Sequence, residues 1–312
     1  MIIDLHCDTI QKAKDENLEL NSRQLDFNLK DVQKYLPYVQ CLATFINTKY
    51  NGGDNGFKRA ISIIDNFYIQ YELNKEKINI IKNKEDLKIE NLNEKLGVIL
   101  TVENGIAISS KLENIKKLYN KGIRMMGITW NDDNELGCGA KTLNDTGLTD
   151  LGIQYVKRLE NKHIIIDVSH CSEKSFYDTL KNTTVPIIAS HSCVKNICNH
   201  VRNLDDNQIK EIAQRDGVIG ICFCRPFLTS NANANVKDIV KHIDYIANLV
   251  GIDYIALGSD FDGVEEEHRL EDIKGVKNIH ILINELYKYG YKKEDVDKIT
   301  SKNFVRVAKQ IL

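Results

Sequence analysis

The alternation of short apolar runs with amphipathic stretches constrains the fold of this chain more than any other feature. Most of the runs are continuously apolar, which is typical of strands covered by helices. Between two of them, the apolar residues of 236–250 fall at offsets 0, 3, 4, 7, 10, 11 and 14, which follow one helical face. Similar helical patterns occupy 57–73, 112–118, 148–159 and 279–286. The eight Ile- and Val-rich runs lie at 2–6, 38–45, 97–103, 123–129, 163–169, 186–190, 217–223 and 254–259.

Strands that alternate with helices predict parallel β/α units. Eight such units in 312 residues match a (β/α)8 TIM-type barrel, which needs about 250 residues plus insertions. A doubly wound open sheet is the alternative, but no glycine-rich phosphate loop follows the first strand. The chain has only three prolines and no Gly/Ser-rich linker, so we expect residues 1–312 to form a single domain.

Charge and hydropathy exclude several classes of protein. The net charge of −2, from 42 basic and 44 acidic residues, argues against a nucleic-acid or anionic-membrane partner. No apolar run approaches the roughly 18 residues that span a bilayer. The first residues include Asp4 and lack the basic region of a signal peptide, so we expect a cytoplasmic protein. In a reducing compartment the eight cysteines, which form no CxxC pair, are expected to be packed thiols.

Active sites of such barrels lie at the C-terminal ends of the strands. Strand periodicity sends His6 and Asp8 to one side of the first run, with Ile3, Leu5 and Cys7 on the other. Further His or carboxylate residues follow the third, fifth, sixth and eighth runs: Glu103, Asp167, His170, His191, Asp260 and Asp262. A His-x-Asp triplet alone is weak evidence. A second one, His242-Ile243-Asp244, lies on the helix 236–250, where we expect a solvated pair off the apolar face.

The combination indicates a metal site. In a closed barrel the strand ends converge on one cavity, where unrelated buried polar groups would each need a partner. Shared metal ions would satisfy them together. Imidazole and carboxylate ligands without thiolates favour Zn²⁺, Mn²⁺ or a similar ion in a hydrolytic site. Six or more ligand atoms indicate two divalent metal ions, and Glu103 is the candidate bridge because its two oxygens can reach both.

These residues, in this order, resemble the membrane dipeptidase (renal dipeptidase) family of zinc peptidases, which belongs to the amidohydrolase-like barrels. The matching stretches run from the first strand nearly to the last residue. They are 4–8, 103–105, 167–170, 190–192, 202–203, 258–263 and 303–307.

The resemblance implies hydrolysis of dipeptides, with tolerance of a D-residue at the C-terminal position, and it suggests a homodimer. It implies that Asp260 is the general acid/base and that Arg202 binds the terminal carboxylate of the substrate. It also implies two Zn²⁺ ions that share Glu103, one held with His6 and Asp8 and the other with His170 and His191.

The fourth strand departs from the family pattern. In mammalian members a histidine follows its threonine, whereas here Thr129 is followed by Trp130 and Asn131. Trp130 can neither ligate a metal nor accept a proton, so Asn131 is a candidate for contacting the substrate in its place. The mechanistic hypothesis is that a metal-bound hydroxide attacks the peptide carbonyl while Asp260 transfers the proton to the leaving amine.

Several alternatives stay open at this point. Asp262 shares the strand parity of Asp260, and we favour Asp260 because Gly258 ends the strand just before it. Asp4 is expected to orient a ligand from deeper in the barrel. Arg202 could instead form a surface salt bridge with Asp205 or Asp206.

The alternative functions are a deacylase or cyclic-amide hydrolase of the same architecture and a non-catalytic metal-binding barrel. The hydrolases of the first group often bridge their metals with a carboxylated lysine, and no lysine ends the fourth predicted strand. A non-catalytic barrel would be expected to lose Asp260 or a ligand, and this chain keeps them all.

Overall fold

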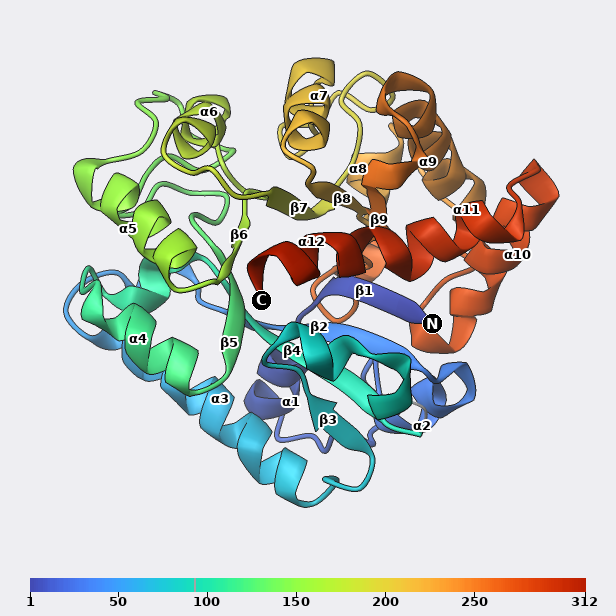
Figure 1. Cartoon of the computed structure of the whole chain (residues 1–312), viewed down its shortest axis with the longest axis horizontal. Coiled ribbons are helices and arrows are strands. Elements are labelled where there is room, and N and C mark those ends of the chain that lie inside the picture. The colour runs from blue at the N-terminus through green and yellow to red at the C-terminus, as the bar shows by residue number, and fades with distance from the viewer. Residues whose placement is uncertain (93) are drawn as a thin grey trace.

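The strands form a closed parallel barrel, which confirms the predicted fold class. The computed structural model describes residues 1–92 and 94–312. Around the ring the order runs from β2 through β1, β9, β8, β7, β6 and β5 to β4, and β4 pairs with β2 to close it. Helices surround the strands (Figure 1). The strands of the ring are β1 (Ile2–Cys7), β2 (Tyr38–Phe45), β4 (Leu96–Glu103), β5 (Ile123–Gly127), β6 (Ile165–Asp167), β7 (Ile187–Ser192), β8 (Val218–Ile221) and β9 (Ile255–Leu257).

One further strand, β3 (Ile78–Ile80), was not predicted. It pairs with the first residues of β4, from Leu96 to Val98, whereas β5 pairs with β4 from Leu100 onward. β3 therefore lies against the start of β4, outside the ring of eight. Three residues are too few to give a periodic signal in the sequence.

The five predicted helices are all present, and α9 (Val236–Val250) has the predicted bounds. Side chains that accept backbone N–H groups fix several helix starts, among them Thr149 before α5 and Ser172 before α6. The other helices are α1 (Thr9–Asp15), α2 (Leu29–Val32), α3 (Asn55–Glu72), α4 (Glu113–Asn120), α5 (Asp150–Asn161), α6 (Glu173–Lys181), α7 (Asp206–Gln214), α8 (Arg225–Leu228), α10 (Ile279–Tyr289), α11 (Lys293–Asp297) and α12 (Asn303–Ile311).

Two apolar clusters make up the core. The outer cluster joins the barrel to the surrounding helices. The inner cluster fills the barrel from its N-terminal end, where Phe304, Val307 and Ile311 of α12 pack with residues near the strand starts such as Ile3 and Val39. Figure 1 shows α12 lying across the middle of the barrel. Because α12 covers this end, a cavity for chemistry is left at the opposite end of the strands.

The predicted alternation of side chains along the first strand is wrong. Ile3 and Leu5 belong to the inner cluster, but Cys7 belongs to the outer one. The register of β1 on β2 shifts between Asp4 and Cys7, and this irregularity turns His6 inward where strict alternation from Leu5 would turn it outward. β7 has a similar shift on β8, between Ala189 and Ser192.

The expectation that His242 is solvated is also wrong. Its side chain is fully buried, with Nδ1 accepting from the Val194 N–H at 2.9 Å and Nε2 donating to the Leu228 carbonyl at 3.0 Å. Asp238 and His242 are both buried on α9, and His242 contacts the segments that follow β7 and β8 through Val194 and Leu228. The apolar pattern records only the stripe that faces the barrel.

The remaining sequence expectations concern cysteines and membranes. All eight cysteines are free, and all but Cys171 are buried, as expected for packed thiols. Within 1–92 and 94–312, no helix has both the length and the apolar character needed to cross a bilayer.

We predict that His242 makes stability fall in mild acid. Burial lowers the pKa of His242 to about 4, below the roughly 6.5 of an unfolded histidine. Its contribution is therefore complete above pH 6.5 and is lost as the pH falls toward 4, by about 1.4 kcal/mol per pH unit. His242→Gln keeps one acceptor and one donor but does not titrate. Urea unfolding at pH 7.5 and pH 5 should show a larger acid loss for the wild type, by about 2 kcal/mol; equal losses would contradict the prediction.

Candidate active site

Polar side chains at or just after the ends of β1, β4, β5, β6, β7 and β9 meet at the C-terminal end of the barrel. They surround a cleft of about 430 Å³. The cleft is lined by several of the residues that the sequence singled out: Asp8, Glu103, Asn131, His170, His191, Arg202 and Asp260. His6 lies beneath them and is 2% exposed.

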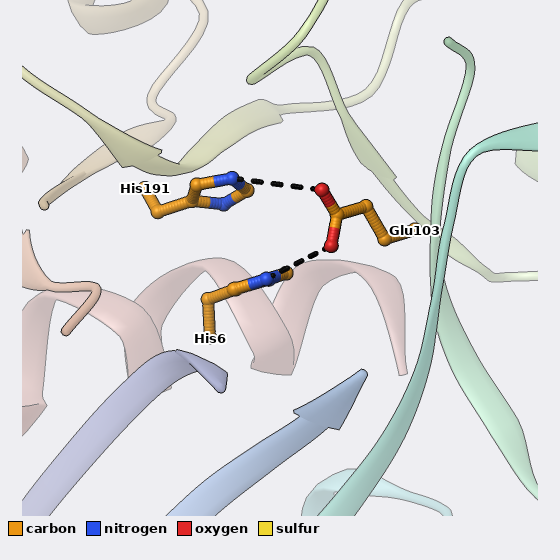
Figure 2. Close-up of side chains that lie close together, drawn as sticks. All are labelled: His6, Glu103 and His191. Carbon is orange, nitrogen blue, oxygen red and sulfur yellow. Dashed lines mark ion pairs between the residues drawn. The ribbon is translucent and has the colours of Figure 1, made fainter. Parts of the chain in front are cut away.

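Glu103 lies at the centre of this group, at the end of β4. Its Oε2 is 3.1 Å from His6 Nε2, and its Oε1 is 2.8 Å from His170 Nε2 and 4.0 Å from His191 Nε2. Figure 2 shows the two carboxylate oxygens directed toward different histidines, His6 and His191. His6 Nε2 is also 3.4 Å from Asp8 Oδ2 and 3.8 Å from Asp260 Oδ1. One carboxylate thus joins two sets of ligand-type atoms.

The protonation of the histidines leaves nitrogen lone pairs facing Glu103. Burial, together with the charge of Arg202, lowers the pKa of His170 to about 4. Burial and the charge of His6 hold the pKa of His191 well below its usual range, so both rings are neutral at pH 7. Their Nδ1 atoms have partners outside the cluster, Asn131 Oδ1 at 3.0 Å and Ser190 Oγ at 2.8 Å. With Nδ1 carrying the hydrogen, each Nε2 presents a lone pair.

This arrangement fits divalent metal ions. The two Nε2 atoms are only 2.8 Å apart, and both face a carboxylate oxygen. Lone pairs at such distances repel unless a cation lies among them. The Oδ1 of Asp8 is buried without a hydrogen-bond partner, which adds one more atom for a cation to satisfy. Within the described part of the chain, His6, Glu103 and His191 form one ligand group, and His6, Asp8 and Asp260 form another.

Asp260 and Asp262 differ clearly in their surroundings. Asp260 lines the cleft, and burial, opposed by the charge of His6, raises its pKa to about 8. The side chain of Asp262 is completely buried and accepts hydrogen bonds from Thr9 Oγ1 at 2.6 Å and from the backbone N–H groups of Asp26 and Phe27. Asp262 is therefore occupied in joining loops, whereas Asp260 can take up and release a proton in the cleft.

Gly263 follows this pair and cannot carry a side chain. A Cβ atom there would lie 2.3 Å from Asp8 Oδ2 and 2.4 Å from Asp260 Oδ1. The glycine allows the backbone to pass close to both carboxylates, and so lets Asp8 and Asp260 approach the same point.

Arg202 is buried at the other end of the cleft, with 2% of its surface exposed. Its Nη2 donates to the His191 carbonyl at 3.0 Å, but Nε and Nη1 are buried without partners. The alternative of a salt bridge with Asp205 or Asp206 is wrong, since Asp205 caps α7 and Asp206 accepts from Asn196 and Tyr245. Nη2 has a second hydrogen, so a carboxylate can bind it together with either Nε or Nη1 in a two-pronged contact.

Aromatic side chains form part of the cleft wall. Trp130 packs against Phe45, with ring centroids 5.2 Å apart, and its ring lies 6.2 Å from that of His170. Phe227 lies 5.5 Å from the guanidinium of Arg202. Trp130 thus lines the cavity, while the adjacent Asn131 supports His170 through its side-chain oxygen.

Comparison with known proteins agrees with this geometry. A model of the membrane dipeptidase family (peptidase family M19) matches residues 1–312. The chain belongs to this family. A Klebsiella pneumoniae relative, described only as an uncharacterised protein in the pqqA 5′ region, is 35% identical over 226 residues, which cover 69% of this chain and 82% of that protein.

Solved structures of M19 metallopeptidases share the fold. The dipeptidase AC superposes with a TM-score of 0.91 at 19% identity, covering 99% of this chain and 98% of its own. A metallopeptidase from Rhodobacter sphaeroides, with a phosphinate mimic of the dipeptide L-Ala-D-Ala, gives a TM-score of 0.91 at 19% identity over 100% and 99% of the two chains. At this level of identity the likeness shows the fold.

Sequence reasoning missed several residues around the site of this M19 chain. Phe45 ends β2, so its position at a strand end was a usable signal. Phe227 and Lys141 line the cleft from loops and helix starts, where no periodicity marks them. The Sγ of Cys222 donates to Asp260 Oδ2 at 3.6 Å, a contact hidden by the apolar run that contains this cysteine.

We predict opposite structural roles for the two aspartates. Asp262→Asn replaces an acceptor by a donor where N–H and O–H groups already point, and should lower the free energy of unfolding by roughly 2–4 kcal/mol. Asp260→Asn removes a carboxylate that Asp8 and Glu103 repel, and should leave stability unchanged or raised. Urea unfolding of both variants after chelator treatment measures this, and similar losses in the two would refute the assignment.

Proposed function

We propose that this chain hydrolyses dipeptides with the help of two divalent metal ions, most simply Zn²⁺, bound around Glu103. The observation that carries the proposal is the pairing of two features in one cleft. The lone pairs of His170 and His191 converge with Glu103 at one side, and the unpaired Nε and Nη1 of Arg202 lie at another. Membership of the M19 family supports the same reaction.

Charge along the cleft supports a substrate with two charged ends. Arg202 and Lys141 supply positive charge, which suits a free C-terminal carboxylate. Asp8, Asp260 and Glu265 line the cleft as well, and suit a protonated amino terminus. A free amine would distinguish dipeptides from the N-acyl amino acids of the alternative deacylase reaction.

The stereochemical preference is a finer proposal. The Rhodobacter sphaeroides metallopeptidase was solved with a mimic of L-Ala-D-Ala. We extend tolerance of a C-terminal D-residue to this chain, because a bidentate contact between Arg202 and the carboxylate fixes that end of the substrate independently of its side chain. The cytoplasmic location and the homodimer stay predictions from the sequence.

The residues act on protons and on orientation. When bound, divalent ions lower the pKa of water and withdraw electron density from a carbonyl oxygen. His6, Asp8 and Glu103 would hold one ion, and Glu103, His170 and His191 the other. Asp260 lines the cleft, with Oδ1 3.8 Å from His6 Nε2, and would take the proton from the attacking water and deliver it to the leaving amine. Asn131 lines the cleft, and in this proposal its amide nitrogen donates to the substrate carbonyl while its oxygen contacts His170 Nδ1.

Metal removal tests the reaction. Treatment with a chelator should lower the hydrolysis of L-Ala-L-Ala by roughly 100-fold or more, and added Zn²⁺ should restore it. Circular dichroism of the stripped protein serves as the control for folding. Full activity in stripped, folded protein would rule out the proposed chemistry.

Arg202 provides a second test. Arg202→Ala should lower kcat/KM for L-Ala-L-Ala by roughly 10–100-fold, because hydrogen bonds between charged groups contribute about 1.5–3 kcal/mol. The C-terminally amidated dipeptide should be affected much less. Arg202→Lys keeps the charge but not the planar fork, so its kcat/KM for L-Ala-L-Ala should lie between the values of the wild type and Arg202→Ala. Equal losses on the acid and the amide would exclude a carboxylate-binding role.

A further inference from the structure

A buried carboxylate lies behind the metal-ligand cluster without touching it. Asp167, at the end of β6, is 7% exposed and accepts four hydrogen bonds. Its Oδ1 accepts from Ser190 N at 2.9 Å, Ser169 N at 3.1 Å and Ser169 Oγ at 2.6 Å. Its Oδ2 accepts from Ser190 Oγ at 2.5 Å. Two backbone N–H groups and two hydroxyl groups thus surround one carboxylate.

These contacts fix the direction of every hydrogen in a short chain. The hydroxyl of Ser190 has a single hydrogen, and it donates this hydrogen to Asp167 Oδ2 at 2.5 Å. The oxygen of Ser190 has two other close neighbours, Ser169 Oγ at 3.1 Å and His191 Nδ1 at 2.8 Å. The hydrogen of Ser169 goes to Asp167 Oδ1 at 2.6 Å, so Ser190 accepts from His191 Nδ1. The hydrogen of the neutral ring then lies on Nδ1, and the lone pair of Nε2 faces Glu103.

We call an aspartate that accepts from both the backbone N–H and the hydroxyl of one serine a clamp. The barrel contains a second clamp, and within residues 1–92 and 94–312 its serine forms no hydrogen bond with a histidine side chain. Asp4 accepts from Ser259 N at 2.8 Å and from Ser259 Oγ at 2.5 Å, nearly the distances in the Asp167–Ser190 pair. The other contacts of Ser259 Oγ are to backbone, the His6 carbonyl and the Phe261 N–H, both at 3.3 Å. The two pairs share their structural part, so a comparison isolates what the contact to His191 adds.

We propose that Asp167 is a positioning residue that, through Ser190, keeps His191 in the Nδ1–H form needed to bind a metal ion through Nε2. This relay of hydrogen bonds, from Asp167 through Ser190 to His191, rests on the proposed metal site, but it can be tested without measuring catalytic turnover. It assigns a task to two residues whose side chains touch neither substrate nor metal. The register shift of β7 between Ala189 and Ser192 is the local backbone feature that places Ser190 and His191 together on the inner side.

Asp167→Asn should reverse the relay. The two backbone N–H groups on Oδ1 would hold the amide oxygen of the new side chain, which places its NH₂ group against Ser190 Oγ. Ser190 would then accept from the amide and donate to His191 Nδ1, moving the ring hydrogen to Nε2. Nitrogen-15 NMR of the histidine-labelled full chain, with and without Zn²⁺, should show Nδ1–H for His191 in the wild type and Nε2–H in the metal-free variant.

Metal retention gives the second measurement. Under competition with a chelator, Asp167→Asn should bind one of its two Zn²⁺ ions roughly 10–100-fold more weakly than the wild type. Ser190→Ala removes the acceptor without forcing the wrong form, so its loss should be smaller. Ser259→Ala, the matched control from the second clamp, should retain metal like the wild type.

The outcomes separate this proposal from the proposed function. An Nε2–H signal for His191 in the wild type, or unchanged tautomer and metal retention in Asp167→Asn, would overturn the relay. If Asp167→Asn does not fold, the tautomer of His191 in the wild type and the metal retention of Ser190→Ala still test the relay. A wild type with the expected tautomer and two bound ions that leaves dipeptides intact would contradict the function and leave the relay standing.

Discussion

The structure depends on one electrostatic constraint, the crowding of acceptor atoms at the open end of the barrel. Three carboxylates and three imidazoles converge there, and the Nε2 atoms of His170 and His191 lie 2.8 Å apart, closer than two lone pairs tolerate. Burial raises the pKa of Asp8 to about 6 and that of Asp260 to about 8, so the negative charge of these two carboxylates is unfavourable in this cluster unless a cation compensates it. Cations shared among these atoms resolve the conflict, and a hydrolytic metal site follows from the same requirement.

The backbone adapts to this requirement where strand geometry alone would fail. Strict alternation would send His6 and His191 toward the helices, and the register shifts in β1 and β7 turn both rings into the barrel. In β4, Ile99 lies in the inner cluster and Glu103 follows it at an even spacing. The one register shift between β4 and β5 inserts its extra residue in β5, so the alternation along β4 is kept. Asp260 adopts a positive φ of 64°, which aspartate tolerates better than most residues, at the turn that brings it beside Asp8.

This separates what the sequence could predict from what it could not. Continuous apolar runs located the eight strands of the ring, and helical periodicity located the main helices. The polar residues at the strand ends identified the side chains that meet in space. Alternation could not foresee the register shifts, since these depend on pairing between strands distant in the chain. The burial of His242 was missed for a related reason, because the loops that cover it are contributed by residues near 194 and 228. β3 was too short to detect.

The barrel interior is apolar near α12 and polar toward the open end of the strands. The layer between them contains buried polar side chains that are both packed and hydrogen-bonded. Ile165 and Ile188 belong to the apolar inner cluster near α12, while Asp167 and Ser190 come two residues further along the same strands. A buried carboxylate is tolerated there because four donors satisfy it, so that layer is both a packed part of the core and a source of fixed hydrogen-bond direction. Through Ser190, this layer contacts the Nδ1 of His191, one of the candidate ligands above it. In the proposed relay, this layer would set the position of the ring hydrogen of His191. Its residues follow the strand pattern, but the directions of their hydrogen bonds depend on the assembled sheet.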